Sequence, residues 1–229
     1  VLQAQLQQAV AARLPAGATA PRVTVSVTDV VPLVAADPRG AGLAAAAFPL
    51  VLGGMLGGIG ITLVLVGALR RLVALGVYVV IAGIAVAAVM QGWFGVLQGP
   101  YVLNAAVVAL SLLAIGAPIV GFAALVGTRG VAIGPILFLL IANPMSSATQ
   151  PIEFLPAPWG AIGQWFPPGA GATLVRDSSY FPDADTLFPW LVLACWAAAG
   201  VILALAGHFR QTAGATHEAI EEAQEAATV

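Results

Sequence analysis

The sequence predicts an all-α fold, a polytopic bundle of transmembrane helices. Of its 229 residues, 60 % are hydrophobic and 8 % are charged, whereas soluble domains carry about 25 % charged residues. The apolar residues form long runs without the period-two alternation of strands, so helices are expected. Eight arginines against ten acidic residues give a net charge of −2, which excludes a basic nucleic-acid binder.

Four segments are long enough to cross the roughly 30 Å hydrocarbon layer as helices. They contain no charged side chain and comprise residues 43–69, 72–97, 102–126 and 187–207. A fifth apolar segment, residues 131–143, would rise only about 20 Å as a helix. We expect it to begin near Gly127 and to break before Pro144, because proline disfavours helical geometry in the preceding residue. The sequence therefore predicts five spans.

The arginines predict the orientation, because cytoplasmic connections carry an excess of basic residues. If the spans alternate, four of the arginines beside them fall on one side: Arg70, Arg71, Arg129 and Arg210. Residues 98–101 and the long connection over residues 144–185 fall on the other side. We expect a multi-pass plasma-membrane protein with its N-terminus outside and its C-terminus in the cytoplasm.

The residues before the first span indicate the end of an extracellular domain, residues 1–42. Leucine and valine recur every four residues over residues 2–14, which is typical of an amphipathic helix. Residues 22–31 alternate valine with threonine and serine, which predicts a half-buried strand. A lone strand is not stable. We therefore expect Val1 to be the cut end of a longer, six-span protein.

Residues 144–185 are rich in proline and aromatic residues. We expect two short helices, over residues 157–165 and 169–176, that form a re-entrant or interfacial hairpin before the last span. Irregular backbone at membrane depth needs a cover of protein or water, so the hairpin should pack on the outer mouth of the bundle. The predicted mouth residues are Glu153, Trp159 and Trp165. The alternative is an ordinary extracellular loop with interfacial aromatics.

The permease domain is expected to cover residues 43–210, and a polar tail follows it. Residues 211–229 contain four glutamates and no basic cluster that would bind anionic lipid. They predict a short, solvated cytoplasmic helix.

The first predicted span contains GGMLGGIG, in which glycines four residues apart form two overlapping pairs. The pairs are Gly53 with Gly57 and Gly54 with Gly58. Glycines at this spacing let a second helix approach closely. We expect a tight helix contact, either within one chain or between chains.

Few polar side chains lie in the spans, and Asn104, Ser111 and Asn143 are the candidates to line a pathway. Each has the alternative of a hydrogen bond between helices. The spans contain no acidic residue, histidine or arginine, which ion and proton pathways use. This favours a lipid-like or amphipathic substrate, or a bundle that transports nothing.

Signals of catalysis are absent from the sequence. His208 and His217 lack metal-ligand spacing, and Cys195 lies in a span, where it favours packing. The segment GTRGVAIG has glycines but lacks the GK[ST] of a phosphate-binding loop. We expect no enzyme activity, cofactor or metal in this chain, so a separate subunit would hydrolyse any ATP.

Three stretches resemble the membrane domain of type-2 ABC exporters, within the YhgE/Pip-like (phage-infection-protein) branch. They are residues 37–58, where the first span begins, residues 143–181 with the segment PIEFLP, and the last span. The resemblance implies six spans, with a large extracellular domain after the first. It also implies paired permeases, separate ATPase subunits, and export of drugs, lipids or polysaccharides. The candidate docking residues for an ATPase are Arg70, Arg71 and Arg129.

Two functions follow from these observations. The first is a permease subunit of an ABC-type exporter that moves a hydrophobic or amphipathic substrate outward, as a homodimer or paired permease in contact with membrane lipid. The second is a membrane anchor, scaffold or phage-receptor-like protein whose extracellular domain binds a partner without transport.

Overall fold

The computed structural model describes residues 2–13, 24, 33–35, 37–38 and 40–226, and these contain helices and no strand. The chain divides into two units, Val1–Pro32 and Leu33–Val229. In the first unit, helix α1 covers Leu2–Ala11, where the sequence predicts an amphipathic helix. The strand expected at residues 22–31 lies outside the described residues, apart from Thr24.

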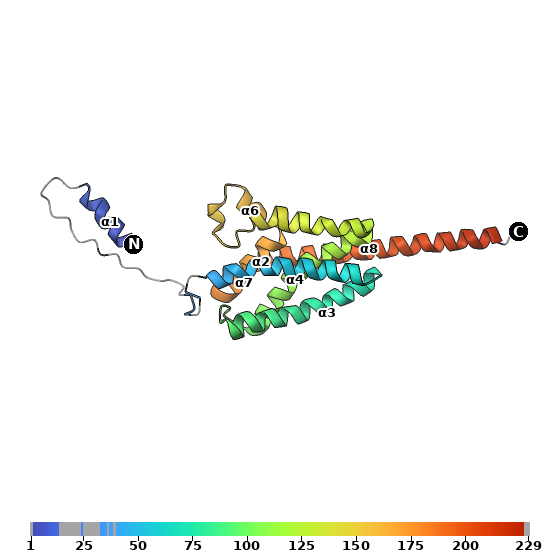
Figure 1. The fold of residues 1–229 in the computed structure, drawn as a ribbon, viewed down its shortest axis with the longest axis horizontal. Coiled ribbons are helices and arrows are strands. Elements are labelled where there is room, and N and C mark those ends of the chain that lie inside the picture. Colours follow the sequence, from blue (N-terminus) through green and yellow to red (C-terminus); the bar gives the residue numbers. More distant parts are fainter. Residues whose placement is uncertain (1, 14–23, 25–32, 36, 39, 227–229) are drawn as a thin grey trace. The chain divides into compact units, whose positions relative to one another are not determined.

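Four helical stretches in the second unit are long and apolar enough to cross a membrane (Figure 1): Ala41–Val64, Ala68–Trp93, Tyr101–Ala132 and Leu187–Arg210. They contain α2 (Ala41–Val64), α3 (Ala68–Ala87) with the π-helical turn η1 (Ala88–Trp93), α4 (Tyr101–Val126) and the first part of α8 (Leu187–Ala226). All four correspond to predicted spans. The chain is therefore all-helical where it is described, with the helices expected of a membrane protein.

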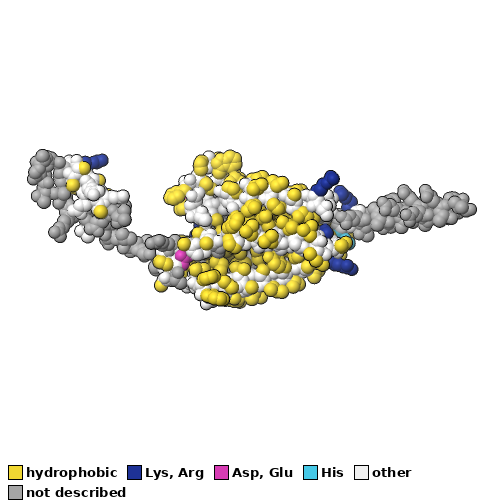
Figure 2. Space-filling model, viewed as in Figure 1, with side chains coloured by type: hydrophobic (Ala, Val, Ile, Leu, Met, Phe, Trp, Pro, Cys, Tyr) yellow, Lys and Arg dark blue, Asp and Glu magenta, His cyan; other side chains and the backbone are white. Residues whose placement is uncertain are grey.

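Helix α4 is the central helix of the bundle. In its most apolar window 72 % of the residues are buried, against 22 to 33 % in the other three long helices. A helix that is apolar on every side is stable where other helices surround it, and Val107, Ile115 and Ile119 of α4 are accordingly 0 to 1 % exposed. The surrounding helices present large apolar side chains outward, which gives the surface its continuous yellow cover in Figure 2.

The segment after α4 turns back along that helix. Gly127, with a φ of 75°, ends α4, and the chain continues as the 3-10 turn η2 (Gly127–Ala132), the π-helical segment η3 (Pro135–Ala142) and α5 (Asn143–Met145). Figure 1 shows this return segment in yellow-green and yellow. Its buried Phe138 packs with Ile115 and Ile119 of α4. Pro135–Met145 is an apolar helix shorter than a span.

The expected break before Pro144 is wrong. Asn143 has helical angles, φ −63° and ψ −42°, and its amide donates to the carbonyl of Phe138 at the end of η3. Pro144 thereby becomes the second residue of α5. A proline at the start of a helix is tolerated because its missing N–H is not needed there.

The two short helices expected before the last span are present as α6 (Trp159–Gly163) and α7 (Pro167–Tyr180). Helix α7 is longer than expected at both ends. It begins on Pro167 and Pro168, which suit the first turn of a helix. Its Ala170 and Leu174 are 1 % and 0 % exposed and belong to the main apolar core, together with Leu193 of α8.

The polar tail continues the last long helix. Helix α8 runs without interruption to Ala226, over 40 residues. The expected separate short helix is therefore one piece with the predicted span. The tail contains alanine, glutamine and glutamate, which are strong helix formers, and no proline.

The charged residues of the second unit whose side chains the structure describes lie at opposite ends of the bundle. We call one end the arginine end; it comprises Arg70, Arg71, Arg129 and Arg210. Figure 2 shows dark blue side chains gathered at this end of the bundle and a small magenta, acidic patch at the other end. The acidic end comprises Asp37, Glu153, Asp177, Asp183 and Asp185.

Candidate functional site

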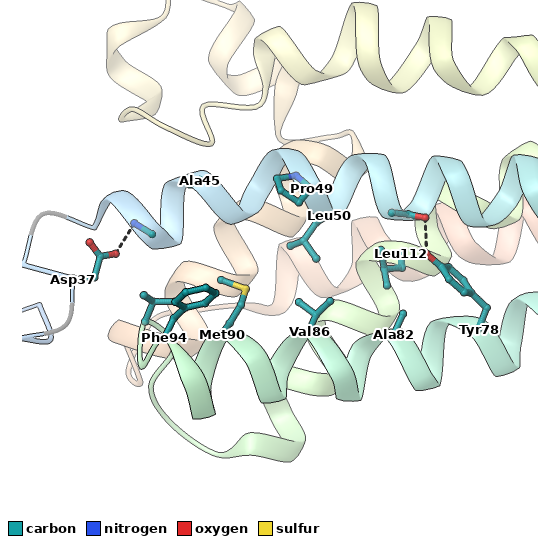
Figure 3. Close-up of a pocket in the computed structure, with 13 residues that line it drawn as sticks. Asp37, Ala45, Pro49, Leu50, Tyr78, Ala82, Val86, Met90, Phe94 and Leu112 are labelled. Atoms are coloured by element: carbon teal, nitrogen blue, oxygen red, sulfur yellow. Dashed lines mark hydrogen bonds between the residues drawn. The ribbon is translucent and has the colours of Figure 1, made fainter.

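A cavity of about 560 Å³ lies between α2 and α3 (Figure 3). It extends from Asp37, at the acidic end, to Tyr78 in the middle of α3. The remaining lining residues are mostly small or apolar: Gly42, Ala45, Pro49, Leu50, Gly53, Ala82, Val86, Met90, Phe94, Val96 and Leu112.

Tyr78 closes the inner end of this cavity. Its hydroxyl donates a 2.9 Å hydrogen bond to the carbonyl of Gly53 on α2, and its ring lies where a side chain on Gly57 would be. The two helices are therefore held together at this level. Towards the acidic end, small residues such as Gly42, Ala45 and Ala82 leave the space between them unfilled.

The cavity opens on the apolar outer surface of the bundle. Ala45, Pro49 and Phe94 line it and are exposed, whereas Leu50 and Leu112 at its back are buried. A molecule in this cavity would therefore contact apolar side chains over most of its length. Apolar clefts with a few placed polar groups are typical of ligand sites.

Asp37 is the charged residue of the cavity, and it is only 6 % exposed. Its carboxylate accepts hydrogen bonds from the amides of Ala41 and Gly42, both at 2.8 Å, and of Leu43 at 3.1 Å. These amides lie in the first turn of α2, where a negative charge is stabilised by the helix dipole. Asp37 is not among the site residues predicted from the sequence, although an aspartate just before an apolar helix is a signal for a helix start.

Tyr180 of α7 lies close behind Asp37. Its hydroxyl donates a 2.6 Å hydrogen bond to the carbonyl of Val96. Burial raises the pKa of Tyr180, and the negative charge of Asp37 raises this pKa further. The neutral phenol thus ties α7 to the connection between α3 and α4, beside the charged end of the cavity.

Two further cavities flank the first half of α2. One, of about 480 Å³, contains Leu43 and Ala44 of α2 together with Glu153, Arg176 and Tyr180. The other, of about 270 Å³, contains Ala47 and Phe48 of α2 and the segment Asn143–Gln150, except Met145. The first half of α2 is therefore loosely packed on several sides.

The four predicted glycines lie in contacts within the chain. A Cβ on Gly54 would be 2.8 Å from the Cβ of Ile115, and one on Gly58 would be 2.9 Å from the carbonyl oxygen of Gly116, so both face α4. Gly57 faces the ring of Tyr78 of α3, and Gly53 lies between the two helices, where a Cβ would be 3.1 Å from Leu112 Cδ2 of α4 and 3.8 Å from the Tyr78 hydroxyl. One side of α2 thus packs on α4 and the next on α3.

A second set of close glycine contacts, which was not predicted from the sequence, joins α4 to α8. Gly121 lies against the carbonyl of Gly200, Gly200 against the backbone at Pro118, and Gly207 against Ala124. Gly200 and Gly207 are seven residues apart, a helical spacing that a search for glycines four apart does not find.

Two of the predicted pathway residues are hydrogen-bonded outside the three cavities around α2. The amide nitrogen of Asn104 donates to the side-chain oxygen of Gln91 at 3.0 Å and to the carbonyl of Gln98 at 2.8 Å. Ser111 donates to the carbonyl of Val107 at 2.8 Å, one turn earlier on α4. Asn143 lines the 270 Å³ cavity.

The predicted mouth residues lie at the acidic end. Glu153 lines the 480 Å³ cavity, and Trp159, at the start of α6, is 52 % exposed. The ring of Trp165 packs edge-on against Phe188 of α8, with ring centroids 5.0 Å apart. Nothing in this arrangement places Trp159 against the cavity between α2 and α3.

The arginine end brings together residues from three helix junctions. Arg71 and Thr128 line one cavity of about 170 Å³, and Arg210 donates a 2.7 Å hydrogen bond to the carbonyl of Leu125. Within the described residues, no group of three or more His, Cys, Asp or Glu side chains is arranged to hold a metal ion.

No protein-family model, curated protein or solved structure matches this chain. The resemblance to type-2 ABC exporters therefore remains a prediction from residues 37–58, residues 143–181 and the last span.

Proposed function

We propose that the chain is an integral-membrane permease that moves a hydrophobic or amphipathic molecule outward across the plasma membrane. The observation that carries this proposal is the apolar cavity between α2 and α3, which opens on the side of the bundle. A molecule dissolved in the lipid layer would reach this cavity without passing through water. Its apolar part would then lie against Leu50, Val86 and Met90.

The polar groups of the cavity favour a particular kind of amphipathic molecule. Asp37 and the hydroxyl oxygen of Tyr78 are hydrogen-bond acceptors. Pro49 has no N–H, so the carbonyl of Ala45 lacks its usual helical donor. We therefore expect a substrate whose polar end donates hydrogen bonds or carries a positive charge.

In this proposal the bundle has five spans, formed by α2, α3, α4, the return segment Gly127–Met145 and α8. The packing of Phe138 against α4 supports the return segment as the fourth span in order. Burial of α7 against the core supports α6 and α7 as a re-entrant or interfacial hairpin at the outer mouth. The arginine end faces the cytoplasm, because basic residues accumulate there.

The energy for transport would come from separate ATPase subunits, as the resemblance to type-2 ABC exporters implies. The permease would work as a homodimer or paired permease, and the exposed turns with Arg70, Arg71 and Arg129 would be the docking sites for the ATPase. These parts of the proposal depend on the resemblance alone.

The experiment that tests the cavity compares two substitutions on one helix. Ala82 lines the cavity, whereas Ala85, three residues later on α3, is exposed on the outer surface. Ala82→Trp should fill the cavity and abolish binding of the cationic dye ethidium and the neutral dye Nile red to the purified chain. Ala85→Trp should leave binding unchanged.

Equal dye binding by the parent and Ala82→Trp would exclude this cavity as the substrate site. Absence of dye binding by the parent would favour the anchor or scaffold function instead. In proteoliposomes with a candidate ATPase, dye movement independent of ATP hydrolysis would contradict the exporter assignment.

A further inference from the structure

We infer that the arginine end of the bundle is a binding site for the phosphate headgroups of anionic membrane lipids. This inference does not depend on transport or on the cavity between α2 and α3. It rests on the position of four arginines at one end of the bundle, on the lack of an ion pair to them among the described side chains, and on the apolar surface beside them.

Two of the four arginines are fixed at helix ends by backbone carbonyls. The Nε of Arg71 donates a 2.8 Å hydrogen bond to the carbonyl of Leu65, just after α2, and Arg210 bonds to the carbonyl of Leu125, near the end of α4. Each bond uses one of the five N–H groups of a guanidinium. Arg71 also lines the 170 Å³ cavity between the two turns, together with Thr62, Gly127 and Thr128.

Among the residues whose side chains the structure describes, no ion pair balances the positive charge of this end. The ion pair within that part of the chain joins Arg176 to Asp177, at the acidic end. Arg70 and Arg71 lie in the first turn of α3, which contains no acidic residue. The helix dipole is positive there, so two more positive charges are unfavourable. A bound phosphate would remove this repulsion.

Large apolar side chains border the arginines on the outer surface. Val64 and Val66 are each 80 % exposed, Val126 is 57 % exposed and Phe209 is 66 % exposed. Arginines next to such a surface lie at the level of lipid headgroups. Basic pockets between transmembrane helices bind anionic headgroups in the same way. The apolar border favours a lipid over a soluble phosphate or an acidic protein.

The test uses the full chain in neutral detergent and measures binding of fluorescent phosphatidylglycerol and fluorescent phosphatidylcholine by anisotropy. Each arginine near a headgroup should contribute about fivefold in affinity. The double variant Arg70→Gln/Arg129→Gln removes two exposed positive charges. It should bind phosphatidylglycerol at least fivefold more weakly, with a melting temperature no lower than that of the parent.

Arg176→Gln is the matched control, because it removes one positive charge at the acidic end; its preference for phosphatidylglycerol should equal that of the parent. Equal affinity of the parent for both lipids, or an unchanged preference in the double variant, would overturn the inference. Competition by inorganic phosphate as effective as that by phosphatidylglycerol would assign the site to a soluble anion instead. An ATPase whose binding needs Arg70 and Arg129, without any lipid preference, would make the arginine end a protein-docking surface.

Discussion

The indole N–H of Trp196 on α8 donates a 2.8 Å hydrogen bond to the carbonyl of Trp165, between α6 and α7. The ring of Trp196 also meets Phe138 edge-on at 5.4 Å and lies 5.8 Å from the ring of Phe166. One side chain of the last long helix therefore contacts both the return segment and the hairpin of α6 and α7.

Trp196→Phe should loosen that hairpin. The substitution keeps an aromatic ring but removes a hydrogen bond, which is worth about 0.5 to 1.5 kcal/mol. We expect faster amide hydrogen exchange in α6 and at the start of α7. Trp93→Phe is the control, since Trp93 is 82 % exposed. Unchanged exchange in Trp196→Phe would show that the ring contacts alone hold the hairpin.

Gly58→Ala should destabilise the bundle, whereas Gly60→Ala should not. A Cβ on Gly58 would lie 2.9 Å from the carbonyl oxygen and 3.0 Å from the Cα of Gly116, and backbone cannot easily move away. Gly60, on the same helix, has nothing within 4 Å of its Cβ position. Overpacking costs about 1 to 3 kcal/mol, and melting in detergent would measure it. Equal melting temperatures for both variants would contradict the α2–α4 contact.

Asn104→Leu should lower stability without changing dye binding. The substitution leaves the side-chain oxygen of Gln91 and the carbonyl of Gln98 without their donor, which costs about 1 to 3 kcal/mol when such groups are buried. Ser111→Ala should cost less, because Ser111 bonds only to its own helix. A loss of dye binding at unchanged melting temperature would instead support the predicted role of Asn104 in the pathway.

Asp177 should make stability decrease as the pH rises. Burial raises the pKa of Asp177 above its ordinary value of 3.8, and the charge and hydrogen bond of Arg176 only partly oppose this. The folded state thus favours the protonated form of Asp177. The contribution of this group to the stability of the folded state is complete below the ordinary pKa. It is lost as the pH rises through the raised pKa of the folded state.

The melting temperature of Asp177→Asn, relative to that of the parent, should therefore rise as the pH is raised from acidic to neutral. Asp183→Asn, at an exposed position, is the matched control. A constant difference between Asp177→Asn and the parent over this range would contradict the raised pKa.

Cysteine labelling in whole cells checks the proposed orientation. In a Cys195→Ala background, Asp183→Cys should react with a membrane-impermeant maleimide from outside. Thr128→Cys, at the exposed turn beside Arg129, should react only after the membrane is opened. Labelling of Thr128→Cys from outside would reverse the orientation.

The long helices could be predicted because apolar length alone decides them. Residues 43–69 and 102–126 differ from α2 and α4 by a few residues at their ends, where Asp37 and Pro100 set the start of each helix. The π-helical turn before Pro144 could not be predicted. It is a shift in hydrogen-bond register, to which no residue type corresponds.

The cavity could not be predicted from the residues that line it. Ala45, Ala82 and Val86 are ordinary residues for a membrane helix. They line a cavity only because α2 and α3 are separated at this level. The paired glycines did indicate where helices come close. They did not indicate that Gly57 receives the ring of a tyrosine, because that contact depends on Tyr78, which is distant in sequence.

The two halves of helix α2 differ in how closely they pack against the rest of the bundle. From Gly53 to Gly58 its backbone lies close to Leu112, Ile115 and Gly116 of α4 and to Tyr78 of α3. Before Pro49, which interrupts the hydrogen bonding of the helix, cavities flank it on several sides. The second half of α2 is therefore fixed to the bundle by close backbone contacts, whereas the first half has open space on several of its sides.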